Sequence, residues 1–200
     1  MQHALNVLVF IIKKFLDLTA NIYYNQLVER CKQGDSRSFS VLYHQYAKAM
    51  FSTCYRLLND FAAAEDVLQE AFTDAFRHLQ HFEYKSSFGA WLKQIVVNKC
   101  ITHLRKNKIK WIDVENSEAD KLTEEPELDE NEIEYKVQEI KQAIQQLPNG
   151  YRTVLTLYLL EGYDHEEIAQ ILGITHSTTR TQYKRAKDKL IQLIKNGASR

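Results

Sequence analysis

The sequence predicts an all-α protein made of two small helical domains joined by an acidic, flexible linker. Three observations support this fold class. Apolar residues recur at helical spacings of three and four along most of the chain. The 200 residues include only two prolines and six glycines, which is little turn chemistry for a many-stranded β fold. An acidic segment without sustained apolar periodicity, residues 111–131, separates the two helical parts.

Residues 1–24 form an extension ahead of the main pattern. The run from Leu5 to Ile12 is apolar, but Lys13 and Lys14 end it short of the about 20 residues that a membrane span needs. No basic leading segment or convincing cleavage site indicates a signal peptide. We interpret the extension as an extra amphipathic helix or a disordered leader, and contact with a membrane surface or a partner is the alternative.

Residues 25–110 predict a bundle of helices. The first two helices are separated at Gly34 and Asp35, and a third covers residues 62–80. A loop at residues 81–89 then leads into a fourth helix. Its expected core side consists of Leu92, Val96, Val97, Cys100 and Leu104.

Residues 132–195 predict a second, smaller helical domain. Its first helix has an apolar stripe and ends before Pro148. The stripe consists of Ile133, Val137, Ile140, Ile144 and Leu147. A short apolar helix follows at residues 151–162, and Asp164 with Glu167 forms a capping box for the next helix. Gly173 is expected in a turn, and Thr175 is expected to cap the last helix.

The segment from His165 to Leu190 has the pattern of a helix-turn-helix. Small Ala169 stands where the two helices approach, and Tyr183 and Ala186 face inward on the second helix. The outward face combines hydroxyls with cations, which suits contact with phosphates and base edges in a major groove. Its candidate DNA-binding residues are His176, Ser177, Thr178, Arg180, Thr181, Lys184 and Arg185. A helical hairpin with a solvated charged face is the alternative.

A second constellation surrounds Trp91, which shares one side of its helix with Asn98, Thr102 and Arg105. The preceding loop interleaves aromatic, hydroxyl and basic residues, the combination that binds unpaired bases and their backbone. These loop residues are Phe82, Tyr84, Lys85, Ser86, Ser87 and Phe88. The alternative is that Trp91 packs under the loop and that the neighbouring cations are merely solvated.

The third predicted helix has an acidic face with Asp66, Gln69, Glu70 and Asp74. Such faces are usually solvated. In a chain with two DNA-binding patterns, this one also suits a basic protein partner.

The net charge of zero hides an uneven distribution. Residues 93–110 contain six Lys or Arg and no acid, whereas residues 113–134 contain eleven Asp or Glu and one Lys. Residues 175–200 contain seven Lys or Arg and one Asp. Two candidate anion-binding surfaces therefore flank an acidic tether.

Three cysteines, Cys31, Cys54 and Cys100, lie far apart and predict buried, reduced thiols in a cytosolic protein. We find no metal-ligand spacing among the histidines and no glycine-rich phosphate loop. The sequence therefore predicts no cofactor, no metal, no catalytic residues and no small-molecule substrate.

These residues resemble a known family. The chain resembles a group IV (extracytoplasmic-function, ECF) sigma factor of bacterial RNA polymerase. Residues 63–106 look like sigma region 2 and residues 147–190 look like sigma region 4, in the right order and spacing. The resemblance covers about residues 25–194 and implies region 2 at 25–110, a linker at 111–131 and region 4 at 132–195.

The resemblance also implies roles for individual residues. Asp66, Gln69, Glu70 and Asp74 would bind the β′ clamp coiled coil of core polymerase. The loop from Phe82 to Phe88 would capture a flipped base of the −10 element. Trp91 and Asn98 would lie near the upstream edge of the melted DNA, with Arg105 and Lys106 on its backbone. The helix from Thr175 would read the −35 element.

The implied partners are core RNA polymerase, including its β flap, promoter DNA and a membrane-bound anti-sigma factor. The implied protein is cytoplasmic, initiates transcription and is not an enzyme. Two positions depart from the family pattern: Thr179 replaces the usual Val, and Gln182 stands where a basic DNA-contacting residue is common. A two-domain regulator with a ligand pocket in its first half is the competing interpretation.

Overall fold

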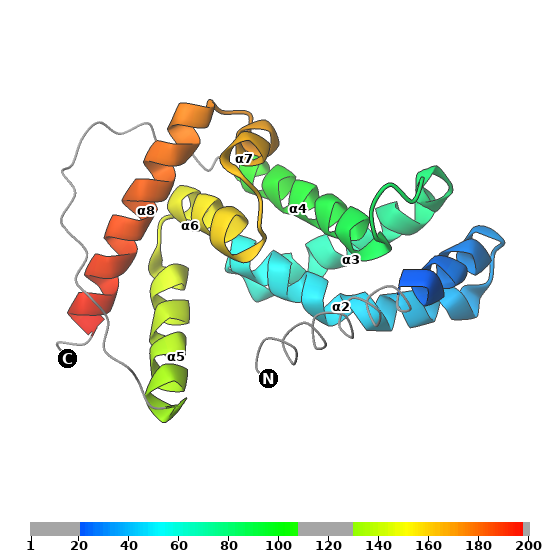
Figure 1. Cartoon of the computed structure of the whole chain (residues 1–200), viewed down its shortest axis with the longest axis horizontal. Helices are drawn as coiled ribbons and strands as arrows, with labels where there is room; N and C mark the ends of the chain where they lie inside the picture. Colours follow the sequence, from blue (N-terminus) through cyan, green and yellow to red (C-terminus); the bar gives the residue numbers. More distant parts are fainter. Residues whose placement is uncertain (1–20, 108–129, 198–200) are drawn as a thin grey trace, which may run out of the picture. The chain divides into compact units, whose positions relative to one another are not determined.

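The computed structural model describes residues 21–107 and 130–197, with the side chains of 130–136 excluded (Figure 1). Every regular element in these residues is a helix, as the fold class predicts. The expectations for residues 1–20 and for the linker up to residue 129 lie outside the described residues. Among the described helices, none is both long and apolar enough to cross a bilayer.

The described residues of the first half contain a helical segment at residues 21–32 and three further helices. These are α2 (Ser36–Leu58), α3 (Phe61–Arg77) and α4 (Phe88–Lys106), with a short 3₁₀ turn, η1 (Leu79–His81), between the last two. The break at Gly34 and Asp35 is confirmed. Gly34 has a φ of 89°, which favours glycine, and the Asp35 carboxylate accepts hydrogen bonds from Ser38 Oγ at 2.7 Å and Arg37 N at 3.1 Å.

The predicted core side of α4 is confirmed, because its five apolar residues are at most 3% exposed. The loop before it is shorter than expected. Leu79, Gln80 and His81 form the 3₁₀ turn and α4 already begins at Phe88, so residues 82–87 alone connect the two elements.

The second half contains α5 (Glu130–Gln146), α6 (Asn149–Leu155), a π-helical turn η2 (Thr156–Leu160), α7 (His165–Leu172) and α8 (His176–Gly197). Helix α8 packs against α5, α6 and α7. Leu147, Leu155 and Ala186 form the buried centre of this packing. The π turn was not predicted; its closing hydrogen bond runs from Glu161 N to Thr156 O, five residues back, at 3.0 Å.

The apolar stripe of α5 is only partly a core face. Ala143 and Leu147 are 5% and 2% exposed, whereas Val137 and Ile140 are each 40% exposed. The side chain of Ile133 lies outside the described residues. Helical periodicity shows which residues share a face but not how much of that face a neighbour covers, and the neighbours of α5 leave Val137 and Ile140 exposed.

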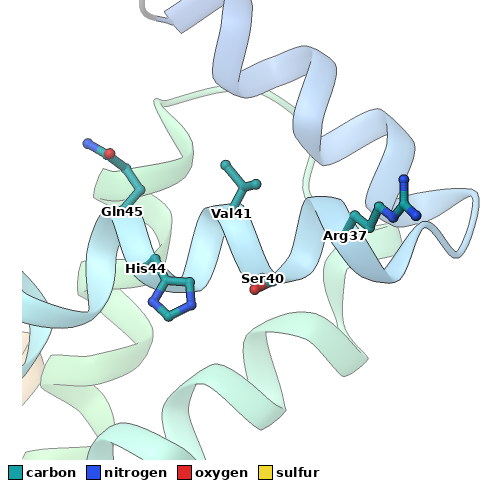
Figure 2. A pocket seen from close by; sticks show the side chains of 5 residues that line it. All are labelled: Arg37, Ser40, Val41, His44 and Gln45. Atoms are coloured by element: carbon teal, nitrogen blue, oxygen red, sulfur yellow. The ribbon is translucent and has the colours of Figure 1, made fainter.

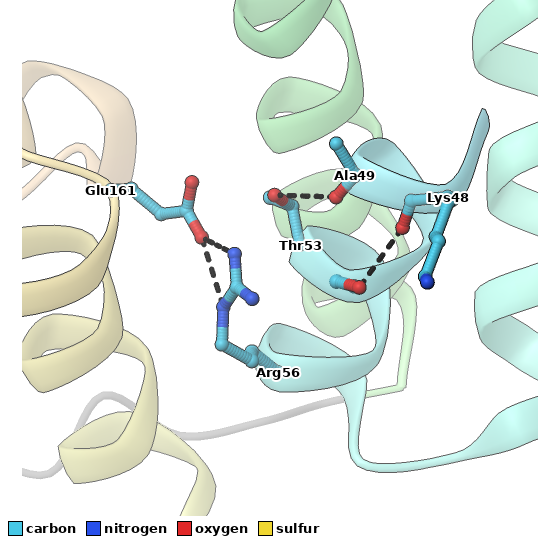
Figure 3. Close-up of polar contacts among 6 residues, drawn as sticks. Lys48, Ala49, Thr53, Arg56 and Glu161 are labelled. Carbon is cyan, nitrogen blue, oxygen red and sulfur yellow. Dashed lines mark hydrogen bonds and ion pairs between the residues drawn. The ribbon is translucent and has the colours of Figure 1, made fainter. Parts of the chain in front are cut away.

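The helices divide between two compact units. The first consists of the described residues up to Cys54 together with Ala62–Lys99, and the second consists of Tyr55–Phe61 and the described residues from Cys100 onward. Within the second unit, the Arg56 guanidinium donates to the buried Glu161 carboxylate at 2.5 and 3.1 Å (Figure 3). All three cysteines are buried, as predicted.

Candidate DNA- and polymerase-binding surfaces

An aromatic cluster holds both ends of the loop at residues 82–87. Phe82 and Phe88 are 3% and 1% exposed, and their ring centroids lie 5.1 and 5.8 Å from that of Trp91. These distances are typical of packed aromatic pairs. Direct stacking of a base on Phe82 or Phe88 does not fit their burial, and we correct their predicted role to holding the loop.

The structure of Trp91 agrees in part with each of its two interpretations, packing under the loop and exposure on the polar side of α4. Its ring is half-buried because it packs on Phe82 and Phe88 beneath the loop. Asn98, Thr102 and Arg105 are exposed on the same helix, as the helical spacing predicts. Trp91 and Asn98 therefore share one side of α4, two turns apart.

The loop itself exposes Tyr84, Lys85, Ser86 and Ser87. The Ser87 hydroxyl accepts a hydrogen bond from Ala90 N at 3.2 Å, so Ser87 also caps the start of α4. Lys85 forms an ion pair with Glu83 at 2.5 Å, and both side chains are strongly exposed. Because exposed ion pairs contribute little free energy, Lys85 can exchange Glu83 for a phosphate at small cost.

The basic end of α4 exposes Arg105 and Lys106. Within the second unit, Arg105 Nη2 donates to the Ile171 carbonyl oxygen at 3.1 Å. Arg105 therefore combines this structural contact with its predicted role on the DNA backbone.

The acidic face of α3 divides into two parts. Asp66, Gln69 and Glu70 are exposed. The carboxylate of Asp74 lies 2.6 Å from Lys99 Nζ, and this hydrogen-bonded pair is the main cause that lowers the pKa of Asp74. Glu70 also lies near Lys99, at 3.6 Å, but it remains exposed. Asp74 is half-buried and therefore presents less of its carboxylate to a partner than Asp66, Gln69 and Glu70 do.

The helix-turn-helix is capped as predicted. The Asp164 carboxylate accepts from the backbone N–H groups of Glu166 and Glu167, each at 2.8 Å, and the Glu167 carboxylate accepts from Asp164 N. Gly173 ends α7 with a φ of 67°. Thr175 Oγ1 accepts from Thr178 N at 3.1 Å and caps α8. These caps fix how the two helices begin, and therefore which side chains α8 presents.

The outward face of α8 agrees with its helical spacing. His176, Ser177, Arg180, Thr181 and Lys184 are exposed, and Thr178 and Arg185 are half-buried. Thr179 is fully buried, and its hydroxyl donates to the His176 carbonyl at 2.8 Å, so the unusual hydroxyl at this position has a partner.

The two halves match two family profiles in succession. Sigma-70 region 2 matches residues 42–109, and Sigma-70, region 4 matches residues 137–190. The RNA polymerase sigma-H factor of Pseudomonas aeruginosa is 37% identical over 175 residues, which are 82% of this chain and 89% of the relative. The chain belongs to the sigma-70 family. Its relatives place it in the ECF group.

The ECF RNA polymerase sigma-E factor of Escherichia coli is 32% identical over 81% of this sigma factor and 89% of its own length. ECF RNA polymerase sigma factor SigW of Bacillus subtilis is 29% identical over 82% of this chain and 92% of its own. A solved structure of the sigma factor RpoE with the anti-sigma factor NepR from Bartonella quintana is 24% identical, with a TM-score of 0.52 over 80% of this chain and 98% of that one. A solved structure of CnrH with the cytosolic domain of CnrY is 21% identical, with a TM-score of 0.50 over 85% and 96%.

Every candidate site residue of this sigma factor lies inside one of the two matched regions. The α3 face, the loop and α4 fall within the region 2 match, and the α8 face falls within the region 4 match. The sigma-70 family consists of non-enzymatic transcription initiation factors. Among the described residues, no group of His, Cys, Asp and Glu is arranged to hold a metal ion.

Sequence reasoning missed one cluster in region 4. The rings of Tyr158 and His165 stack with centroids 4.5 Å apart, and Tyr183 packs against both. Burial, followed by the charges of His176 and Arg180, lowers the pKa of His165. The turn of residues 161–164 brings these rings together, so no helical spacing in the sequence indicates the stack.

Gln182 also differs from its expected role. It is 2% exposed, so it does not replace the surface DNA contact that the family pattern suggested. Neither polar atom of its amide has a hydrogen-bond partner. The departure from the family pattern at this position therefore concerns the packing of α8 and not its DNA-facing surface.

A surface hollow on the first unit bears on the competing regulator interpretation. It measures about 490 Å³ and is lined by Arg37, Ser40, Val41, His44 and Gln45. All five side chains come from α2 (Figure 2), so the hollow lies along one helix and is open. Ligand pockets are usually concave and bury most of the ligand surface, which this one-sided hollow does not offer.

Proposed function

We propose that this ECF sigma factor recognises promoters through two separate surfaces and binds core RNA polymerase through a third. The chain is a promoter-recognising transcription initiation factor by its family. In our proposal the loop of residues 83–87 and the outward side of α4 bind the −10 element. The outward face of α8 reads the −35 element, and the exposed part of the α3 face binds the β′ clamp coiled coil.

The observation that carries the DNA-binding proposal is the outward face of α8. It is the second helix of a capped helix-turn-helix, and His176, Ser177, Arg180, Thr181 and Lys184 are exposed along it. The short hydroxyl of Ser177 stands near the first turn, where an approaching helix comes closest to base edges. Lys184 stands two turns later and can reach the phosphate backbone.

Run-off transcription with purified core RNA polymerase on genomic fragments tests this function. The expected result is that the chain directs core polymerase to a subset of fragments and that the chain alone binds those fragments poorly. A regulator would instead bind duplex DNA without polymerase, usually as a dimer, and would not be required for initiation.

The polymerase surface has its own test. Reversing the charges of Asp66 and Glu70 to lysine should weaken binding to core polymerase, because the clamp surface would then face like charge. Glu65, an exposed acid on the same helix, provides the matched reversal. If the Glu65→Lys variant loses as much core affinity as Asp66→Lys or Glu70→Lys alone, the effect is one of net charge and the assignment to Asp66 and Glu70 fails.

The remaining proposals concern regulation and place of action. Two fold neighbours were solved with an anti-sigma factor or the cytosolic domain of a partner protein. We propose that this chain acts in the cytoplasm, catalyses no reaction of its own, and is held inactive by a membrane-bound anti-sigma factor that covers its polymerase-binding surfaces. Detergent-solubilised membranes should then yield the chain in a complex that excludes core polymerase, and its recovery only with core polymerase would contradict the proposal.

A further inference from the structure

Three side chains tie the loop of residues 82–87 to the helix of residues 21–32 inside the first unit. The Tyr84 hydroxyl donates a short hydrogen bond to the Glu29 carboxylate. The Lys32 ammonium lies 4.4 Å from the centroid of the Tyr84 ring and 3.5 Å from the Glu29 carboxylate. Each group thus contacts the other two, and we name Glu29, Lys32 and Tyr84 the loop clamp.

The loop clamp also holds the main chain. Lys32 Nζ donates to the Phe82 carbonyl at 3.1 Å, and Gln80 Nε2 donates to the Lys32 carbonyl at 2.8 Å. The Lys32 side chain is only 15% exposed, so its charge is held in one place by these contacts. Both ends of the clamp are therefore fixed, one on a helix and one at the start of the loop.

Tyr84 adopts a backbone conformation that needs such support. Its φ is 59°, in the left-handed region that residues with a side chain rarely occupy. A residue persists there when its surroundings fix it more strongly than the conformation disfavours it, and such residues concentrate at functional sites. Its ring also packs on the Phe82 ring, with centroids 4.7 Å apart.

The clamp determines what the loop offers to DNA. The Tyr84 hydroxyl is occupied by Glu29, and the Lys32 ammonium covers the Tyr84 ring. Burial and the bond to Glu29 raise the pKa of Tyr84, so its hydroxyl remains a donor at neutral pH. Apart from Glu83, the exposed loop residues that have polar groups to present are then Lys85, Ser86 and Ser87.

We propose that Glu29 and Lys32 are positioning residues for promoter melting, which hold the loop in one conformation through Tyr84 so that residues 85–87 meet the −10 strand already ordered. This inference rests on the proposed function of the loop. It assigns a role in −10 recognition to two residues of the helix of residues 21–32, which the resemblance to known sigma factors did not single out.

Electrostatics alone makes the opposite prediction. Glu29 is 55% exposed beside a surface proposed to bind phosphates, so removing its charge should strengthen binding to DNA if it were a bystander. If the loop clamp orders the loop, removing the Glu29 charge should instead weaken selective binding, because the free energy of ordering the loop is then spent when DNA binds. The sign of the effect therefore separates the two explanations.

The first experiment measures amide hydrogen exchange at both ends of the loop in the free, full-length chain, where Phe82 N donates to the Leu79 carbonyl and Ala90 N donates to the Ser87 hydroxyl. Glu29→Ala and Tyr84→Phe each remove the hydrogen bond and should speed exchange about fivefold, the factor that a bond of ordinary strength contributes. Glu29→Gln keeps an acceptor oxygen and should stay close to wild type. Unchanged exchange in both the alanine and the phenylalanine variants would overturn the clamp, and Tyr84→Phe preserves this test if Glu29→Ala does not fold.

The second experiment measures sequence selection by the holoenzyme on forked DNA with a randomised single-stranded segment. Wild type should enrich one −10 sequence. Glu29→Ala and Tyr84→Phe should each lower that enrichment about fivefold, and the double variant should be no worse than either, because both act through one bond. The control Glu65→Gln, which removes an exposed charge on α3 outside both the clamp and the loop, should leave the preference intact.

The outcomes separate this inference from the proposed function. If wild-type holoenzyme enriches no sequence, the function assigned to the loop is wrong, and hydrogen exchange still decides whether the clamp orders it. If wild type selects a sequence and Glu29→Ala selects it equally while binding all DNA more tightly, Glu29 is a bystander and the inference is wrong.

Discussion

The two candidate DNA-binding surfaces of this sigma factor are built in different ways. On α8, the exposed residues follow helical spacing, and the caps at Asp164 and Thr175 fix where the helices begin. In the first unit, a short loop presents most of the exposed residues, and its conformation depends on contacts of Phe82 and Tyr84 with residues 50 and 55 positions away. Substitutions on the exposed face of α8 should therefore leave its backbone conformation unchanged. The conformation of the loop should instead depend on residues that lie outside the DNA-binding surface.

The largest effect should come from the buried support of the loop. Phe82→Ala should lower the free energy of unfolding by about 3–5 kcal/mol, because it removes a buried ring and leaves a cavity beside Phe88 and Trp91. Urea denaturation of the full chain measures this loss. Lys85→Ala, an exposed change in the same loop, should stay within about 0.5 kcal/mol of wild type. Equal losses of unfolding free energy in the two variants would show that the loop has no buried support, and the contrast with α8 would fail.

On α8, the effect should appear in sequence selection and not in stability. Arg180→Ala should relax the sequence preference at one or two −35 positions by about 1–3 kcal/mol. Lys184→Ala should weaken binding to all promoters alike and reduce the slope of log binding constant against log salt concentration by about one. Holoenzyme binding to a −35 library at several salt concentrations measures both. If Lys184→Ala changes the preference and Arg180→Ala does not, the two roles are reversed.

Gln182 tests whether the interior of α8 is separate from its DNA-facing side. Gln182→Leu replaces a buried amide without hydrogen-bond partners by an apolar side chain of similar size. It should raise the free energy of unfolding by about 1 kcal/mol and leave promoter affinity unchanged. Thermal unfolding and promoter binding measure the two quantities. A loss of promoter affinity with unchanged stability would restore Gln182 as a DNA contact.

The smallest effect concerns pH. The pKa of His165 is lowered from its ordinary value of 6.5, so the unfolded chain binds a proton more readily than the folded chain. Its contribution to stability is therefore present above pH 6.5 and is lost as the pH falls below that value. The lowered pKa of Asp74 affects stability only below its ordinary 3.8, outside the range between pH 7 and pH 5 in which His165 is tested.

His165→Phe keeps a ring to stack on Tyr158 and removes the titration. The melting temperature of wild type should fall more steeply than that of the variant between pH 7 and pH 5. Parallel curves for the two proteins would show that His165 does not contribute to the acid sensitivity.

Sequence reasoning succeeded where local chemistry decides the structure. The capping box at Asp164, the turn at Gly173 and the buried side of α4 each depend on residues a few positions apart. It failed where distant residues decide. The burial of Phe82, the ion pair of Asp74 with Lys99 and the exposure of Ile140 all depend on which element packs against which. Sequence patterns therefore located the residues of the candidate sites. Only the tertiary structure separated the exposed residues, which can contact DNA or polymerase, from the residues that support them.

The burial of the three cysteines has a practical chemical consequence. Cys54 and Cys100 are completely inaccessible, and burial raises the pKa of Cys31 to about 11. At pH 7 only about one Cys31 thiol in ten thousand is then a thiolate, the form that reacts with maleimides and oxidants. A cysteine introduced at the exposed position of Lys85 should consequently take a fluorescent label selectively, in the otherwise wild-type chain. The native chain is thus ready for single-molecule observation of its loop without the removal of any thiol.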